Sequence, residues 1–311
     1  MSKLRNALDQ YLTIRRALGF KLDVQGGLLH RFVDFMETEG ESVITRDGAL
    51  RWATQPKGAQ PAQWAKRLGL VRRLAEYQSA VDPRTQIPPA ELLPHRFQRK
   101  PPYVYSDREI ARLVIAAKQL RSPTGLRAAT FSTLFGLLAV TGMRVGEAIA
   151  LDRQDANLTE GILTIRQAKF GKSRLVPLHA STVDVLRHYA RLRDRIFRTA
   201  MTPSFFISNR GRRLSRSNVK GTFVRLSMQI GLRQPADRRG PRIHDLRHTF
   251  ATRTLLGFYR SGDDVERHMA ALATYLGHAN VLNTYWYLSG VPELFRLASM
   301  RLERKRSEVT P

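Results

Sequence analysis

The chain has 311 residues, no cysteine and a formal net charge of +26, because 52 Lys and Arg residues stand against 26 Asp and Glu residues. This length suits two globular domains, and so large an excess of positive charge indicates a polyanionic partner, with DNA or RNA first and an anionic membrane second. Without cysteine there is no disulfide bond, thiolate nucleophile, cysteine-bound zinc or iron–sulfur cluster, so any catalysis must use oxygen, nitrogen or carboxylate groups.

Neither a secretion signal nor a membrane span is predicted. The N-terminal segment mixes charged and apolar side chains and lacks the continuous apolar region of a signal peptide. The longest uncharged stretch, residues 128–143, has 16 residues and includes Ser, Thr and Gly. It is shorter than the roughly 20 apolar residues that span a bilayer, and it is typical of a buried helix. We therefore expect no membrane partner and a cytoplasmic, nucleoid-associated protein.

The first third of the chain is predicted to be a helical domain. Apolar residues recur at helical spacing over residues 4–14, 28–36 and 64–74, and glycine or proline breakers separate these segments. We expect four or five helices in a domain that covers residues 1–90. Both parts of the chain are basic: residues 1–100 have a net charge of +7 (17 minus 10) and residues 101–311 one of +19 (35 minus 16).

A proline-rich, basic segment is predicted to link two domains. Six prolines occur between residues 83 and 102, which favours extended backbone, and we place the linker at 91–103. Ser106 and Glu109 are typical of a capping box that opens a helix, so the second domain is expected to cover residues 104–311. Two short β-branched runs at 162–165 and 175–178 predict a hairpin. The expected fold is mainly α, with a helical first domain and a mixed α/β second domain that has a small antiparallel sheet.

Two segments of the second domain combine cations with a glycine. Arg144 follows a long apolar stretch and Gly142, and Glu147 lies three residues further on. Taken alone, Arg144 and Glu147 indicate only an ion pair at a helix end. The turn of the predicted hairpin, residues 169–174, has three cations, which is common in exposed turns.

Two further segments contain histidine. His244 and Arg247 are expected on one helix face, where a proton-exchanging ring and a fork of donors suit a phosphate, although such a pair is more often solvated surface. His278 follows Gly277 and precedes Tyr285 and Tyr287, aromatics that singly would be assigned to a core. Taken together, two arginines, a lysine, two histidines and a tyrosine are the groups needed to cut a phosphodiester with a phenolate nucleophile.

The order and spacing of these motifs resemble the catalytic signature of the tyrosine recombinases, the phage integrase family. The resemblance covers residues 103–290 by motifs and 1–100 by architecture, since the family pairs a helical core-binding domain with a mixed α/β catalytic domain. For the site, the resemblance implies that Tyr287 is the nucleophile, that Arg144 and Arg247 clamp the scissile phosphate, and that Lys169 is the general acid. It also implies that His244 and His278 supply hydrogen bonds and manage protons, and that Glu147 orients the site.

Two alternatives stay open within this assignment. Tyr285 is a competing nucleophile, but it lies seven residues after His278, whereas the family's spacing of nine residues fits Tyr287. Lys172 competes with Lys169, although the family uses the lysine just before the turn glycine.

The resemblance also implies how such a site works. Fixed arginines stabilise the charge that develops on the phosphate oxygens and favour the phenolate, and a lysine protonates the leaving 5′ oxygen. A 3′-phosphotyrosine intermediate conserves the backbone bond, so resealing requires no ATP. We expect no cofactor and no metal, because the arginines take the place that Mg²⁺ has at other phosphoryl-transfer sites.

Double-stranded DNA is the expected partner, bound by a homotetramer on two paired sites, and accessory or sister recombinases are possible. Residues 292–302 predict a helix that docks either on its own chain or on a neighbouring protomer through Leu294, Phe295, Ala298 and Leu302. Basic residues of the first domain, the linker and the second domain are candidates for contact with the DNA backbone, although a solvated face is the alternative for each: Arg72, Arg73, Arg96, Arg99, Lys100, Arg210, Arg212, Arg213 and Arg216.

The expected function is site-specific DNA recombination, for integration, excision or transposition of a DNA element. The alternatives are a recombinase that resolves chromosome or plasmid dimers, an enzyme like a type IB topoisomerase, a DNA-binding module without catalysis, and a basic RNA-binding or structural protein. With no extra module recognised before its helical domain, the chain resembles the simple two-domain recombinases, including some carried by mobile elements.

Overall fold

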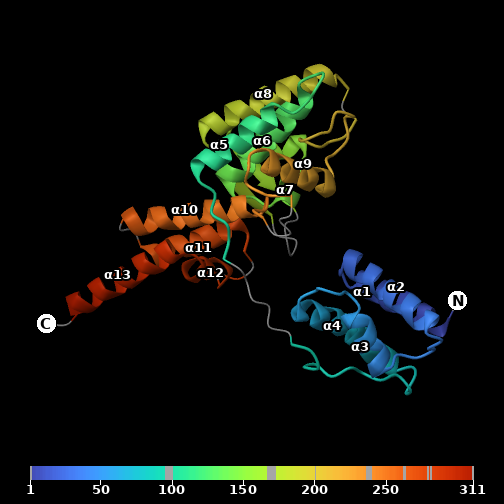
Figure 1. The fold of residues 1–311 in the computed structure, drawn as a ribbon. Coiled ribbons are helices and arrows are strands. Elements are labelled where there is room, and N and C mark those ends of the chain that lie inside the picture. Colours follow the sequence, from blue (N-terminus) through green and yellow to red (C-terminus); the bar gives the residue numbers. More distant parts are fainter. Residues whose placement is uncertain are drawn as a thin grey trace. The chain divides into compact units, whose positions relative to one another are not determined.

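The computed structural model describes residues 2–94, 101–166, 173–199, 201–235, 240–261, 264–278, 280 and 282–309. Within the last of these ranges, side chains are described for residues 282–287, 291–301 and 303. The chain forms two compact units, residues 1–99 and 100–311 (Figure 1). The mainly helical fold class with a small antiparallel sheet is confirmed. No described helix is long and apolar enough to cross a membrane.

The first unit contains four helices in its described part: α1 (Lys3–Ala17), α2 (Asp23–Thr38), α3 (Arg46–Thr54) and α4 (Pro61–Ser79) (Figure 1). Ser2 caps α1 and Thr45 caps α3, because each side chain accepts a hydrogen bond from a first-turn backbone amide that has no partner inside the helix. Leu8, Phe32 and Trp52 lie in an apolar core that the four helices share. The helical spacing of the sequence arises because each helix buries one face in this core.

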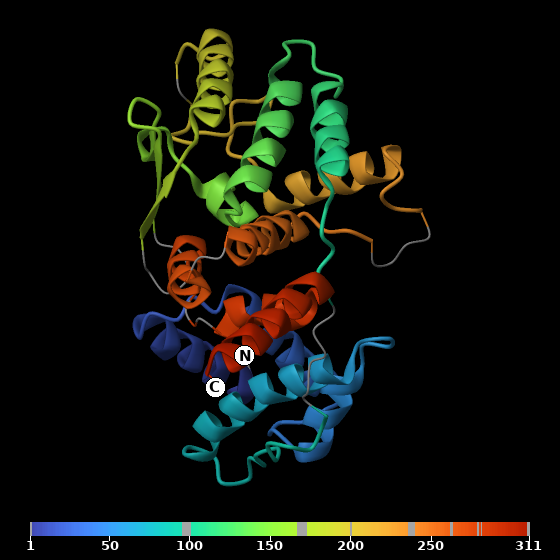
Figure 2. The same ribbon diagram turned by 90° about the vertical axis from the view of Figure 1, so that its left-hand side faces the viewer.

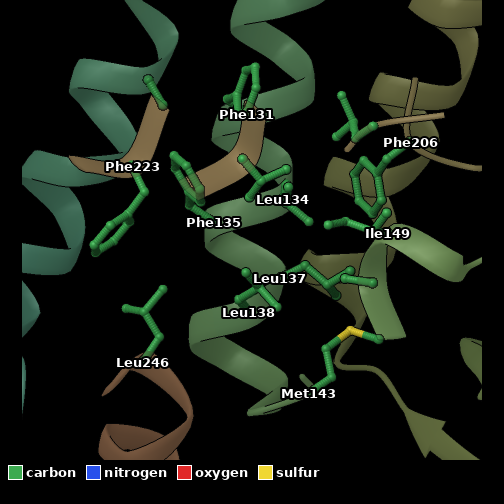
Figure 3. Close-up of a cluster of buried hydrophobic side chains, with 14 of the residues drawn as sticks. Phe131, Leu134, Phe135, Leu137, Leu138, Met143, Ile149, Phe206, Phe223 and Leu246 are labelled. Atoms are coloured by element: carbon green, nitrogen blue, oxygen red, sulfur yellow. The ribbon is translucent and has the colours of Figure 1, made fainter. Parts of the chain in front are cut away.

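The second unit opens with three helices, α5 (Asp107–Lys118), α6 (Leu126–Thr141) and α7 (Val145–Ala150). The predicted capping box of Ser106 and Glu109 begins α5. The uncharged stretch forms α6, whose apolar side chains meet residues of other helices around it in Figure 3, including Phe223 and Leu246. A helix that is apolar on all sides is stable in water only when neighbouring elements surround it, so α6 is the central helix of this core.

A three-stranded antiparallel sheet follows a short 3₁₀ helix at Arg153–Asp155, in the order β1 (Ala156–Asn157), β2 (Ile162–Ile165) and β3 (Arg174–Pro177). Leu163 pairs with Val176 and both are buried, so one face of the predicted hairpin joins the core. The strand β1 was not predicted, because two residues are too short to show alternation. The strands, yellow-green in Figure 2, bring β3 against α11.

The remaining helices are α8 (Ala180–Ile196), α9 (Arg216–Gln229), α10 (Asp245–Ser261), α11 (Val265–Leu276), α12 (Leu282–Gly290) and α13 (Pro292–Val309). The last four share a second apolar cluster that contains Leu255, Leu272, Tyr287 and Leu294. The predicted C-terminal helix therefore packs on its own chain through Leu294, whereas Phe295 is exposed. The side chain of Leu302 lies outside the described residues.

Candidate active site

Arg144 lies at the junction of α6 and α7. Gly142 ends α6 with a φ of +60°, a conformation that turns the chain and that side chains with a Cβ rarely adopt. Arg144 then caps α7. The backbone amide and the Nη1 of Arg144 donate hydrogen bonds to the carboxylate of Glu147 at 2.8 and 2.7 Å. The ion pair suggested by the sequence is therefore present, and it fixes the direction of the arginine.

Glu147 is held from a second side by Arg174 of β3. The Nη2 and Nη1 atoms of Arg174 donate to the two carboxylate oxygens at 2.8 and 3.1 Å, and its Nε donates to the carbonyl of Tyr275 at 2.7 Å. Burial by itself would raise the pKa of Glu147, but the hydrogen bonds from Arg174 and Arg144 lower it to about 2. The sequence indicated Arg174 only as a cation near a turn, because nothing local shows that its partner lies 27 residues away.

The two predicted clamp arginines converge on consecutive carbonyls. The Nη2 of Arg144 donates to the carbonyl of Gly277 at 2.9 Å, and the Nη2 of Arg247 donates to that of Leu276 at 2.6 Å. The Nη1 of Arg247 also donates to the carbonyl of Gly142 at 2.9 Å. These bonds join the ends of α6, α10 and α11, so residues more than 100 positions apart in sequence share one site.

Arg247 is almost fully buried, with 2% of its surface exposed. Its burial, followed by the charge of Arg144, lowers its pKa to about 10. Its guanidinium is therefore still protonated at neutral pH, and its desolvation strengthens any interaction with an anion that enters the site.

His278 follows the αL turn at Gly277 that ends α11. Its Nδ1 lies 2.8 Å from Oγ1 of Thr284, a buried residue that sequence reasoning did not assign. Burial, and then the charges of Arg247 and Arg144, lower the pKa of His278 to about 4. The ring is consequently neutral at neutral pH and is oriented by a hydroxyl.

The two tyrosines of α12 differ sharply. Tyr285 is 42% exposed, whereas Tyr287 is 2% exposed and its hydroxyl lies 2.9 Å from Nδ1 of His248. Tyr287 also lies within electrostatic range of Arg247. Sequence reasoning missed the contact with His248, although this residue directly follows Arg247 in the motif.

His244 is placed slightly differently from the expectation. The helix α10 begins at Asp245, so His244 lies just before it rather than on it, and its carbonyl accepts from the backbone amides of Arg247 at 3.1 Å and His248 at 3.4 Å. His244 has an exposed surface, and its ring lies edge-on to that of His248, with centroids 4.8 Å apart. Desolvation of the ring, followed by the charge of Arg247, lowers the pKa of His244 to about 4. His244 is thus at the rim of the site, beside the buried Arg247.

Several predicted residues lie outside the described part of the chain. Lys169 and its competitor Lys172 belong to the segment between β2 and β3, and Arg96, Arg99 and Lys100 belong to the segment after residue 94. Their positions in sequence remain the only basis for their assignment.

The other basic candidates have different environments. Arg73 of the first unit is exposed, and Arg72 is half-buried, with Nε 3.8 Å from Glu76. In the second unit Arg210 and Arg212 are exposed, while Arg213 is held by Asp152 and the carbonyl of Ile149.

Arg216 stands out among these candidates. Its guanidinium lies so close to Gly146 of α7 that a Cβ at Gly146 would be 2.5 Å from its Nη2. Arg216 is exposed. Because Gly146 is two residues from Arg144, the guanidinium of Arg216 lies next to the site.

The described residues contain no group of three or more His, Cys, Asp or Glu side chains that could hold a metal ion. The side chains that do converge are two arginines, neutral histidines and a buried phenol, with one carboxylate occupied by arginines. Cationic donors beside a phenol are the groups that attack on a phosphodiester by an oxygen nucleophile requires. The fold and the site therefore define a DNA-strand-transfer enzyme of the tyrosine type.

The chain belongs to the phage integrase family, whose model matches residues 104–291. It is 48% identical to the putative integrase/recombinase y4rB of Sinorhizobium fredii over the full length of both chains. It is 27% identical to the tyrosine recombinase XerD of Neisseria meningitidis, over 90% of this chain and 89% of the relative. Its fold is similar to that of a lambda integrase tetramer bound to a Holliday junction, with a TM-score of 0.58 and 19% identity, covering 89% of this chain and 77% of that one. The protein is an enzyme, a site-specific tyrosine recombinase.

Proposed function

We propose that this recombinase cleaves DNA with Tyr287. The phenolic oxygen of Tyr287 attacks the scissile phosphorus, a 3′-phosphotyrosine forms and the 5′ oxygen leaves. The observation that carries this assignment is the burial of the Tyr287 hydroxyl next to His248 and within electrostatic range of Arg247, while Tyr285 is exposed. A nucleophile needs a fixed position and cations nearby, and Tyr287 has both.

Arg144 and Arg247 act as the clamps on the scissile phosphate. Each has one or two of its five N–H donors fixed on backbone carbonyls, so the guanidinium planes are oriented before DNA arrives. Donors that need no reorganisation stabilise the charge of the transition state most effectively. Glu147 orients Arg144, and His244 and His278 supply further hydrogen bonds to the phosphate.

Lys169 is the general acid for the leaving 5′ oxygen. The support for this role is its place in the sequence between β2 and β3, since Arg174 joins β3 to Glu147 and to the carbonyl of Tyr275. Cations near a lysine favour its neutral form and so ease the transfer of its proton, which is the chemistry that this role requires. No cofactor, metal ion or ATP takes part in this scheme.

Double-stranded DNA is the substrate, in the cytoplasm and associated with the nucleoid. Residues 1–90 act as a core-binding domain, 91–103 as the linker and 104–311 as the catalytic domain. The protein acts as a tetramer on two paired sites, as in the lambda integrase structure whose fold it shares. The exposed Phe295 of α13 is the side chain through which this helix reaches a neighbouring protomer. The reaction integrates, excises or transposes a DNA element.

The nucleophile is tested with nicked duplexes drawn from the DNA that flanks the gene, which trap a covalent adduct. The wild-type protein is expected to form an adduct that mass spectrometry maps to Tyr287. The Tyr287→Phe variant should bind duplex DNA normally and form no adduct, and Tyr285→Phe is the matched control that should behave as wild type. An adduct that persists in Tyr287→Phe and disappears in Tyr285→Phe would assign the nucleophile to Tyr285.

A further inference from the structure

His248 lies against the reactive atom of the proposed nucleophile. Its Nδ1 is 2.9 Å from the hydroxyl oxygen of Tyr287, and the two ring centroids are 5.5 Å apart. The contact joins α10 to α12, two helices that share an apolar cluster containing Leu255 and Tyr287. None of the roles proposed for the other residues of the site requires His248.

The ring of His248 is oriented by aromatic neighbours as well as by the phenol. His244 meets it edge-on at 4.8 Å between centroids, and Trp286 meets it at 5.5 Å. Burial of the ring, followed by the influence of His244, lowers the pKa of His248 to about 4. At neutral pH the imidazole is therefore uncharged, and one of its two nitrogens carries no proton and is able to accept one.

The chemistry at Tyr287 needs such an acceptor. A phenol has a pKa near 10, so at neutral pH its proton must leave as the bond from oxygen to phosphorus forms. Arg144 and Arg247 stabilise negative charge but cannot accept a proton. Proton management was expected of His244 and His278, but in the described residues it is Nδ1 of His248 that lies 2.9 Å from the phenolic oxygen, while Nδ1 of His278 faces Thr284. The scissile phosphate brings negative charge into the site, and this charge favours the imidazolium form of a neighbouring histidine.

We propose that His248 accepts the proton of Tyr287 during strand cleavage and returns it during resealing. The step rests on the proposed function of Tyr287. As the bond between the phenolic oxygen and phosphorus forms and the bond from phosphorus to the 5′ oxygen breaks, the phenolic proton moves to Nδ1 of His248 and a proton from Lys169 moves to the 5′ oxygen. In resealing, both protons travel back. His248 is thus a further catalytic residue of the recombinase.

Two substitutions separate proton transfer from simple positioning of the phenol. His248→Ala removes the ring, whereas His248→Asn keeps an amide near the place of Nδ1 that can hold the hydroxyl but cannot take its proton. Single-turnover cleavage of the nicked duplex should be about 100-fold slower in both variants, the lower end of what a general base contributes. The exposed His188 of α8 provides the control, since His188→Ala should cleave at the wild-type rate.

A fluorinated tyrosine at position 287 provides the decisive readout. Ring fluorines lower the pKa of the phenol, so the nucleophile loses its proton without help. The analogue should accelerate cleavage by His248→Ala and His248→Asn by at least tenfold more than it accelerates the wild type. A His248→Asn protein that cleaves at the wild-type rate, or equal effects of fluorination in all three backgrounds, would overturn the proposal.

The same experiment distinguishes failure of this inference from failure of the proposed function. If Tyr287→Phe still forms the adduct, the nucleophile is assigned wrongly and His248 has no proton to accept from it. If Tyr287→Phe forms none but both His248 variants cleave normally, only the role of His248 is refuted. Duplex binding and thermal melting of each variant confirm that the loss of rate is not a loss of fold.

Discussion

At the scale of single residues, the site is built from arginines that have structural partners. Arg144 and Arg174 bind one carboxylate, Glu147, which has 8% of its side chain exposed. A buried carboxylate is tolerated only when its charge is compensated and its oxygens accept hydrogen bonds. Glu147 therefore contributes both to stability and to the direction of Arg144, so the contacts that stabilise the fold also orient a side chain that we propose as a phosphate clamp.

Arg174→Ala is expected to destabilise the protein and to slow cleavage. It leaves Glu147 buried with Arg144 as its remaining cation in this contact, so the free energy of unfolding should fall by about 3 kcal/mol. Chemical denaturation and single-turnover cleavage measure the two effects. Arg260→Ala is the control, because the pair of Arg260 with Glu293 is exposed and should contribute less than about 1 kcal/mol. Equal losses in the two variants would contradict the role of Arg174.

The lowered pKa values of the histidines at the site make the stability of the folded chain depend on pH. The pKa values of His244, His248 and His278 are lowered from 6.5 to about 4 in the folded chain, so between these values the unfolded chain binds more protons. Unfolding therefore takes up protons there, and stability should rise from pH 4 to pH 6.5 and be complete above it. The lowered pKa of Glu147 acts in the same direction but below about 4.5.

Denaturation at a series of pH values checks this dependence. His278→Asn should reduce the slope between pH 4 and 6.5, because it removes one of the three groups. A variant with the full wild-type slope would show that His278 is not held neutral in the folded chain.

At the scale of elements, the ends of helices position the site. Two helices end in glycines with positive φ, Gly142 after α6 and Gly277 after α11, and their carbonyls accept from Arg247 and Arg144. A helix end leaves carbonyls without partners inside the helix, and here the arginines supply donors. The turn that ends each helix thus also fixes an arginine that we propose as a phosphate clamp.

Gly142→Ala tests this coupling. A Cβ at Gly142 would lie 2.4 Å from Cδ1 of Phe250, and the backbone conformation disfavours any side chain, so the free energy of unfolding should fall by about 2–4 kcal/mol. Gly136→Ala within α6 meets no atom within 4 Å and should stabilise by about 0.5–1 kcal/mol. Thermal melting compares them, and a stable Gly142→Ala protein with wild-type cleavage would refute the coupling.

At the scale of the whole molecule, the two units have separate apolar cores. The core of residues 1–99 contains residues such as Phe32 and Trp52, and that of residues 100–311 is built around α6. A unit with its own core can in principle fold without the other, so we expect independent folding here. The net charge is divided as well, at +7 for residues 1–100 and +19 for the remainder, so both can contribute to DNA affinity.

A fragment of residues 104–311 is expected to fold and to retain the adduct-forming chemistry with weaker DNA binding. Because the first domain would neutralise some of the phosphates, removing it should make the slope of log K against log salt less steep by about 0.9 for each of those phosphates. Binding titrations at several salt concentrations measure this slope. A fragment with the affinity and slope of the full chain would show that residues 1–90 do not bind DNA.

The amino-acid sequence by itself determined the fold class and the family. Helical spacing, the capping box of Ser106 and the uncharged helix α6 are local patterns, and local patterns are legible without a structure because backbone geometry repeats over a few residues. The motif around Arg144 and the spacing from His278 to Tyr287 are local in the same sense.

The contacts between motifs were decided by the tertiary structure alone. The carboxylate partner of Arg174, the carbonyls that hold Arg144 and Arg247, and the phenol beside His248 lie between 27 and 133 residues away in sequence. The sequence contains each member of these pairs but no local sign of the pairing, since the partner depends on how helices pack around α6 and on where each helix ends. The residue types of the site could therefore be read from the sequence, whereas the contacts between those residues depend on how the helices of the second unit pack.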